Sequence, residues 1–100
     1  MADIKTELNL NSHNIRELKE KLHNLKPTIV IDDKGLTEEI FQEIDHALNK
    51  DELIKIRTHT DSSEELSTIA EKICHKVKAT LIQILGYIIA IYRKNVQPEE

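Results

Sequence analysis

The chain has 100 residues, of which 39% are hydrophobic and 32% charged, and its formal net charge is −4. This length supports one modest core and one domain over residues 1–100, and the balance of residues excludes an extended disordered protein. Three aromatic side chains exclude a row of rings for stacking bases, and a single cysteine excludes an internal disulfide. The acidic balance argues against nucleic acid as a partner unless the 14 basic residues gather on one surface.

The first part of the chain predicts a helix followed by a short strand. We expect residues 1–10 to be frayed or weakly helical, and Ser12 is a suitable N-cap for a helix that Pro27 ends. The apolar residues of this helix recur at helical spacing and define one face: Ile15, Leu18, Leu22 and Leu25. The stretch TIVI at 28–31 then predicts a short buried strand.

A second helix and a half-exposed strand follow. Thr37 is a suitable N-cap, Leu36 and Phe41 occupy the positions of a hydrophobic staple, and NKDE at 49–52 closes the helix. Its inner face carries Ile40, Ile44, Ala47 and Leu48. Residues 53–59 alternate as a strand with one exposed face does, with Ile54 and Ile56 on one side and Lys55, Arg57 and His59 on the other.

The last part of the chain predicts a third helix and a β-hairpin. SSEE at 62–65 has the pattern of a capping box, and TLIQIL at 80–85 and YIIAIYR at 87–93 are β-rich runs joined at Gly86. We expect a tight antiparallel hairpin with a positive φ at that glycine. The order α-β-α-β-α-β-β predicts an α/β sandwich with a mixed sheet. We expect one core, formed by Ile15, Leu18, Leu22, Ile40, Ile44, Ile54, Ile56, Ile69, Ile73, Ile82, Ile84, Ile89 and Ile91.

Catalytic and metal-site motifs such as GxSxG, a Walker-type loop, HExxH and CxxC do not occur in the sequence. Cys74 and His75 are adjacent on a predicted helix, so their side chains point in different directions. Cys74 flanks the inner face of that helix, where we expect an inert, half-buried thiol. We therefore expect no enzyme, no cofactor, no metal ion and no small-molecule substrate.

The sequence also predicts a location in the cell. Its N-terminus lacks the basic and apolar segments of a signal peptide, and the longest near-apolar run, LIQILGYIIAIY, is too short to span a bilayer. The lone cysteine fits a reducing compartment. We therefore expect a cytoplasmic protein that is not bound to a membrane.

Basic residues recur in three segments of the chain. At about 100° per residue, one flank of the first predicted helix carries Arg16, Lys19, His23 and Lys26. Lys34 follows the first strand, and Lys55 and Arg57 share the exposed side of the second. A solvated helix with mixed charges is the alternative for the first segment alone. The three segments together predict a localised positive patch on an acidic protein.

Gly35, one of only two glycines, lies between a predicted strand and a predicted helix. Glycine allows a positive φ and a close approach of a ligand to the backbone. The N–H groups of the first helical turn, together with Lys34, would favour an anion there. The alternative is a plain turn that needs the glycine only for its backbone conformation.

Residues 23–57, HNLKPTIVIDDKGLTEEIFQEIDHALNKDELIKIR, resemble the central signature of the CRM domain. The resemblance is to its small stand-alone bacterial form, the YhbY-like RNA-binding proteins of ribosome assembly. LKP before the first strand, KGLTE at the turn and ELIKI on the second strand follow that pattern. IQILGYIIAIYR at 82–93 resembles the closing hairpin of the family. The resemblance covers about residues 8–94, which we take as the core of the domain.

This resemblance implies a domain with a mixed four-stranded sheet packed with helices, similar to the C-terminal domain of bacterial translation initiation factor three. It also implies association with ribosomal RNA or with precursors of the large ribosomal subunit during assembly. The family contacts RNA through a KH-like GxxG loop, which falls here on Asp32-Asp33-Lys34-Gly35, with Asp32 in place of the first glycine. The implied RNA-binding residues are Lys34, Gly35, Arg16, Lys19, Lys26, Lys55 and Arg57.

A protein-interaction module on the same fold is the alternative function. In that case the acidic turn at 32–33 would meet a basic ribosomal protein or another basic protein partner. For either function we expect a monomer.

Overall fold

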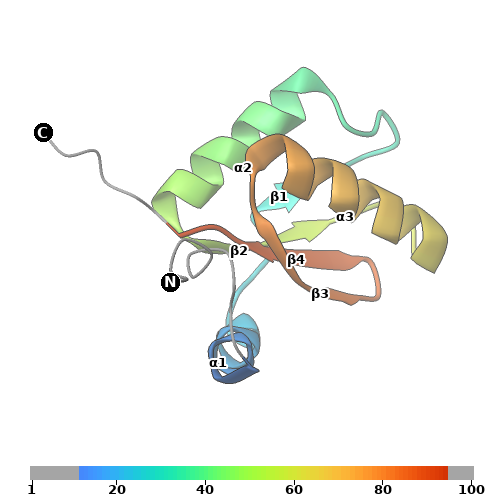
Figure 1. Ribbon diagram of the computed structural model, residues 1–100. Helices are drawn as coiled ribbons and strands as arrows, with labels where there is room; N and C mark the ends of the chain where they lie inside the picture. Colours follow the sequence, from blue (N-terminus) through green and yellow to red (C-terminus); the bar gives the residue numbers. More distant parts are fainter. Residues whose placement is uncertain (1–11, 95–100) are drawn as a thin grey trace, which may run out of the picture.

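The computed structural model describes residues 12–94, with side chains from Ile15 onward, so the segment 1–10 lies outside the described residues. Within 12–94 the elements follow the predicted order α-β-α-β-α-β-β (Figure 1). They are α1 (Ser12–Leu22), β1 (Ile29–Val30), α2 (Glu38–Lys50), β2 (Leu53–Arg57), α3 (Ser63–Val77), β3 (Thr80–Leu85) and β4 (Ile88–Tyr92). None of these helices combines the length and the apolar character that crossing a bilayer requires.

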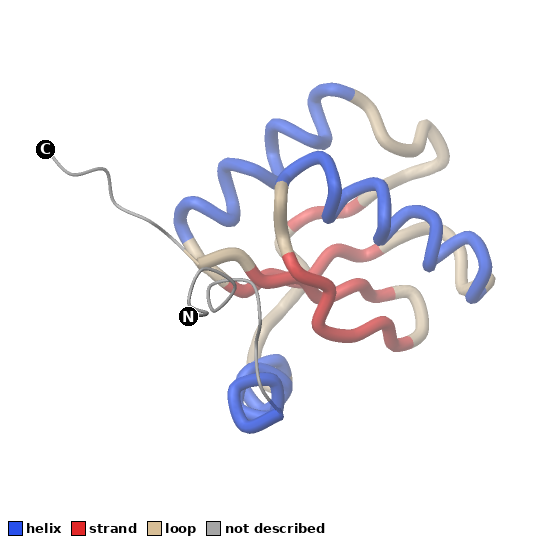
Figure 2. The backbone as a smooth tube through the Cα atoms, viewed as in Figure 1, coloured by secondary structure: helices blue, strands red, loops and turns tan. Residues whose placement is uncertain are grey.

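The four strands form one mixed sheet in the order β1-β2-β4-β3 (Figure 2). β1 and β2 are parallel, because α2 carries the chain back before β2 begins. β4 lies between β2 and β3 and is antiparallel to both. The predicted α/β architecture with a mixed sheet is therefore confirmed.

The two faces of the sheet are covered by different helices: α2 and α3 lie on one face and α1 on the other (Figure 1). The prediction of one core is wrong, because the buried side chains form a separate cluster on each face. The larger cluster packs Ile54 and Ile56 of β2 beneath α2 and α3. The smaller one packs α1 against the sheet and comprises Leu18, Leu22, Leu53, Ile82 and Ala90. Four members of the predicted core are only half-buried: Ile15, Ile40, Ile69 and Ile84.

The helices α2 and α3 begin where the sequence predicts. The Thr37 hydroxyl accepts a hydrogen bond from the Ile40 N–H at 3.2 Å, which caps α2. The Ser62 hydroxyl accepts from the Glu65 N–H at 3.4 Å and caps α3. The N–H of Ser62, however, donates to the Thr60 hydroxyl at 3.1 Å. The predicted capping box at 62–65 is therefore only half formed.

Helix α1 ends at Leu22, before the boundary predicted from Pro27. The next three N–H groups donate to carbonyls three residues back, at 3.1–3.2 Å, so the backbone tightens out of the α-helix. As a consequence Lys26 lies in the loop between α1 and β1 and does not continue the basic stripe of the helix.

The strands also depart from the prediction in two places. Val30 of β1 is 61% exposed, although the sequence predicts a buried strand at residues 28–31. Tyr87 lies in the turn of the hairpin together with Gly86, and β4 begins only at Ile88. Gly86 has φ +62°, as predicted, and a two-residue turn with glycine in this first position suits the twist of the flanking strands.

Candidate nucleic-acid interface

Lys55 and Arg57 of β2 are the only charged residues within the four strands of the described chain. They alternate with Ile54 and Ile56, whose side chains are buried beneath α2 and α3. Both cations therefore lie on the opposite face of the sheet, which is the face that α1 covers. That face carries positive charge and no strand carboxylate.

Arg57 is exposed at the end of β2, and its guanidinium carbon lies 5.8 Å from the centroid of the Tyr87 ring. The Tyr87 backbone is fixed, because its carbonyl oxygen accepts from the Thr58 N–H at 2.8 Å. The buried Thr58 hydroxyl lies 3.0 Å from the same oxygen. Tyr87 is not among the site residues that the sequence predicts, because the run at 87–93 predicts a strand that includes it, whereas it lies in the turn before β4. The cross-strand position of Arg57 next to the hairpin could not be deduced from spacing.

Lys55 is half-buried and makes a contact within the fold. Its Nζ donates to the carbonyl oxygen of Leu25 at 2.9 Å, which ties the loop after α1 to β2. An ammonium has three donors, so Lys55 can still face a phosphate. In doing so its ammonium group would either be shared between the phosphate and the Leu25 carbonyl or lose its bond to that carbonyl. Lys55 is therefore less available to a phosphate than Arg57.

Helix α1 adds exposed cations beside this face of the sheet. Leu18 and Leu22 are buried against the strands, whereas Arg16 and Lys19 are exposed and lie one turn apart on one flank of the helix. The basic residues of α1, which are Arg16, Lys19 and Lys21, outnumber its two glutamates. In α2 the ratio is reversed, since Lys50 stands against Glu38, Glu39, Glu43 and Asp45. Charge is thus segregated between the two sides of the sheet.

In the turn at residues 32–35, two backbone N–H groups donate hydrogen bonds within the turn itself. The N–H of Lys34 donates to Asp32 Oδ1 at 2.9 Å, and the N–H of Gly35 donates to the Asp32 carbonyl at 3.0 Å. Gly35 has φ +79°, as predicted. Asp32 therefore holds the turn in the way aspartate often does, and it occupies two N–H groups that a phosphate would otherwise contact. Glu38 and Glu39 add negative charge to the start of α2.

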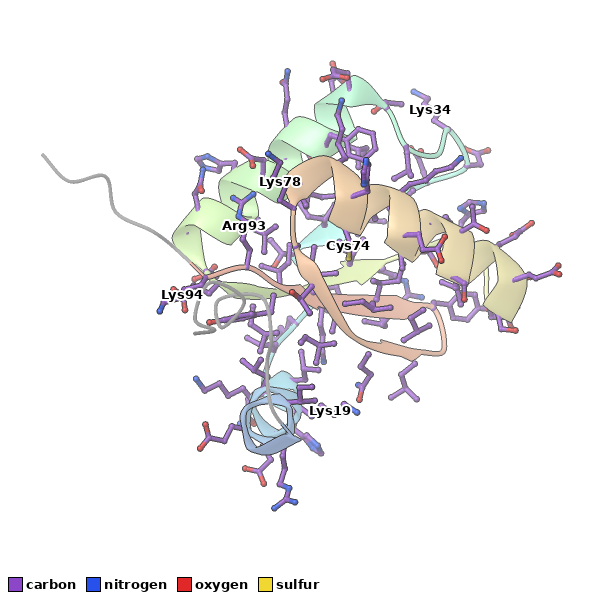
Figure 3. The ribbon with its side chains drawn as sticks, in the orientation of Figure 1. Lys19, Lys34, Cys74, Lys78, Arg93 and Lys94 are labelled. Atoms are coloured by element: carbon purple, nitrogen blue, oxygen red, sulfur yellow. The ribbon has the colours of Figure 1, made fainter. Side chains whose placement is uncertain are left out.

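The predicted patch is divided between two sides of the molecule. Figure 3 places Lys19 on α1 below the sheet and Lys34 on the turn beside α2 and α3. Arg16, Lys55 and Arg57 belong with Lys19 on the α1 side, and Lys26 lies in the loop that leads from α1 to β1. Lys34 and Gly35 lie apart from these residues, in the turn that follows β1.

Arg93 is basic but engaged in the fold. Its guanidinium donates to Asp45 Oδ1 and the Val77 carbonyl, both at 2.8 Å, and to Asn49 Oδ1 at 2.9 Å. It also contacts the Asp45 carbonyl at 3.2 Å. These bonds fasten the end of β4 to α2 and α3, so Arg93 is not a candidate for contact with phosphate.

Among residues 12–94, two groups have a pKa above the ordinary range. Burial raises the pKa of the Cys74 thiol to about 11, so the thiol is protonated and a weak nucleophile at neutral pH. This agrees with the half-buried thiol that the sequence predicts. Burial, followed by the negative charge of Glu52, raises the pKa of the Tyr92 hydroxyl. Neither group supplies a reactive centre.

Residues 10–93 match the CRS1 / YhbY (CRM) domain family. The chain is 31% identical over 85 residues to the Pseudomonas aeruginosa protein named "Probable RNA-binding protein PA4753", covering 85% of this chain and 82% of that one. It is 37% identical over 78 residues to a Haemophilus influenzae protein named "RNA-binding protein", covering 78% and 79%. The solution structure of SAV1595 from Staphylococcus aureus, described as a candidate RNA-binding protein, superposes with a TM-score of 0.77 at 27% identity, covering 91% and 95%.

Proposed function

Because the chain belongs to the CRS1 / YhbY (CRM) domain family, we propose that it is a non-catalytic protein that binds RNA with the α1 side of its sheet. The observation that carries the proposal is the position of Lys55 and Arg57. They are the only strand charges among the described residues, and they lie on the face bordered by the exposed Arg16 and Lys19. The names of the relatives in Pseudomonas aeruginosa and Haemophilus influenzae support RNA as the ligand.

The proposed ligand is ribosomal RNA or a precursor of the large ribosomal subunit, bound during assembly by a cytoplasmic monomer. Arg16, Lys19 and Arg57 contact phosphates, and Lys26 and Lys55 extend the same footprint. Lys34 makes a separate contact from the turn that Gly35 shapes, in place of a complete GxxG loop. This arrangement explains how an acidic protein binds a polyanion, since its excess carboxylates lie on the side of the sheet that α2 and α3 cover.

The dependence of RNA affinity on salt tests the proposal. If about four cations meet phosphates, the logarithm of the association constant should fall against the logarithm of salt with a slope of roughly −3. Binding of a labelled ribosomal RNA fragment is measured by fluorescence anisotropy from low to physiological salt, with an unrelated acidic protein as the control. A flat line, or no binding at low salt, contradicts the proposal.

Matched charge variants locate the footprint. Lys19→Gln with Lys26→Gln should make the slope shallower by roughly 1.5, because two phosphate contacts are lost. Lys50→Gln with Lys72→Gln removes the same charge from exposed positions on α2 and α3 and should leave the slope unchanged. Equal effects of the two pairs would show that only net charge matters. Crosslinking in cells followed by sequencing of the attached RNA tests whether the ligand is ribosomal.

A protein-interaction module remains the second candidate, and the acidic residues around the turn favour it. Asp32, Asp33, Glu38 and Glu39 surround the single cation Lys34 in this segment. A basic ribosomal protein would meet this surface by charge complementarity. Binding of such a protein that is lost in Asp33→Asn with Glu39→Gln, together with no salt-dependent RNA binding, would favour this candidate.

A further inference from the structure

One row of side chains crosses the whole sheet at the end where β2 finishes. The strand register pairs Val30 with Arg57, Arg57 with Ile88, and Ile88 with Leu85. Directly paired residues point to the same face, and Arg57 lies on the α1 face, so all four side chains lie there. With strands about 4.8 Å apart, the row is about 14 Å long. Three apolar side chains thus flank a single guanidinium.

Helix α1 leaves this row uncovered. It packs over the other end of the face, against Leu53, Ile82 and Ala90 (Figure 1). Val30 is 61% exposed and Leu85 is 68% exposed. Of the large apolar side chains exposed in the described chain, only Leu81 lies elsewhere: it pairs with Ile91, which is buried on the face of α2 and α3.

The hairpin turn places an aromatic ring at one end of the row. Tyr87 is 44% exposed, and its ring lies next to Arg57 at 5.8 Å. Because Thr58 holds the Tyr87 carbonyl, little further ordering of the backbone is needed to present the ring. A ring face, an adjacent planar guanidinium and exposed aliphatic side chains are the surfaces on which an unpaired base stacks.

We propose that Val30, Arg57, Ile88 and Leu85, with Tyr87, form a stacking row that binds unpaired nucleotides of RNA. A base stacks on Tyr87 and the neighbouring aliphatic side chains, and Arg57 contacts the adjoining phosphate. Charge selects RNA over a protein partner as the occupant, since the only charge in the row is a cation and the strands carry no carboxylate. The inference rests on the proposed function and specifies which form of RNA the α1 side prefers.

The test compares two substitutions at one position. Tyr87→Leu removes the ring and keeps an apolar side chain, whereas Tyr87→Phe keeps the ring. Affinity is measured for a short single-stranded RNA of mixed sequence and for the same strand annealed to its complement. Tyr87→Leu should weaken single-strand binding about fivefold or more, with Tyr87→Phe within about twofold of the parent chain. Duplex affinity and the salt slope should not change, because no phosphate contact is removed.

A second matched pair tests the aliphatic part of the row. Leu85→Thr should weaken single-strand binding, and Leu81→Thr, on the same strand but the opposite face, should not. Thermal unfolding of each variant checks that the fold is intact. If RNA binds with the expected salt slope but Tyr87→Leu and Leu85→Thr bind as the parent does, the stacking row is refuted and the proposed function stands.

Two other outcomes also overturn the inference. If neither single-stranded nor duplex RNA binds at low salt, the proposed function fails together with it. If the chain self-associates in sedimentation experiments and Leu85→Thr abolishes this association without changing RNA affinity, the row is an interface between two copies.

Discussion

Asp32 combines two effects that one pair of substitutions can separate. Its carboxylate accepts the hydrogen bond from the Lys34 N–H, and it also places a negative charge beside the place proposed for a phosphate. Asp32→Asn keeps an oxygen that can accept this bond and removes the charge. If the carboxylate of Asp32 and a bound phosphate are about 7 Å apart, the repulsion between them is about 0.7–2 kcal/mol for an effective dielectric constant between the values for a protein surface and for bulk water. Asp32→Asn removes this repulsion. RNA binding should therefore tighten roughly three- to thirtyfold at low salt, and less at high salt.

The assay is titration of labelled RNA with the parent chain and four variants. Asp32→Gly also frees the Lys34 N–H and should tighten binding at least as much as Asp32→Asn, while Lys34→Glu should weaken it by a similar factor. Glu71→Gln removes one negative charge from an exposed position on α3 and controls for net charge. If Asp32→Asn, Asp32→Gly and Lys34→Glu all bind RNA as the parent does, the turn at residues 32–35 has no contact with RNA.

Three further predictions concern the fold and Cys74. Ile44→Ala, at a fully buried position, should lower the free energy of unfolding by about 2–5 kcal/mol, as measured by urea denaturation. An unchanged midpoint of the urea transition would disprove the assignment of the buried face of α2. Arg93→Lys should cost about 1–3 kcal/mol, because an ammonium cannot reach the spread acceptors, whereas Lys94→Gln should stay within about 0.5 kcal/mol. At pH 8 Cys74 should be alkylated about a hundredfold more slowly than an ordinary thiol, and the rate should rise with pH towards 11.

The order of the elements and several of their ends could be predicted because those signals are local. The Thr37 cap and the positive φ of Gly35 and Gly86 follow from residue types at single positions. The end of α3 could not be predicted in this way, since Lys78 adopts the left-handed conformation, φ +59°, that usually marks a glycine. Periodicity gives the inner face of one element, but it does not tell which side of the sheet a helix covers. For this reason the sequence predicts one core where the structure has two clusters.

The candidate site was predictable in its residue types and less so in its arrangement. Alternation along β2 correctly puts Lys55 and Arg57 on one side, but the bond from Lys55 to the Leu25 carbonyl depends on how the loop after α1 folds back. Lys34 lies four residues after the end of β1, yet it is on the other side of the sheet from Lys19 (Figure 3). Only the tertiary arrangement brings Tyr87 to Arg57, across a sequence separation of 30 residues.

The segregation of charge between the two sides of the sheet determines which side of the protein would attract RNA. A phosphate chain that approaches α2 meets four carboxylates against one lysine, whereas an approach to α1 and the sheet meets cations and an apolar row. Under the proposed function, attraction on one side and repulsion on the other would orient the protein on the RNA before any close contact forms. The acidic net charge would then be compatible with the proposed RNA binding, because most of the carboxylates lie away from the α1 face, where all the proposed contacts except that of Lys34 are made. The contacts proposed for the α1 face are few, so RNA affinity should depend strongly on each of Arg16, Lys19 and Arg57.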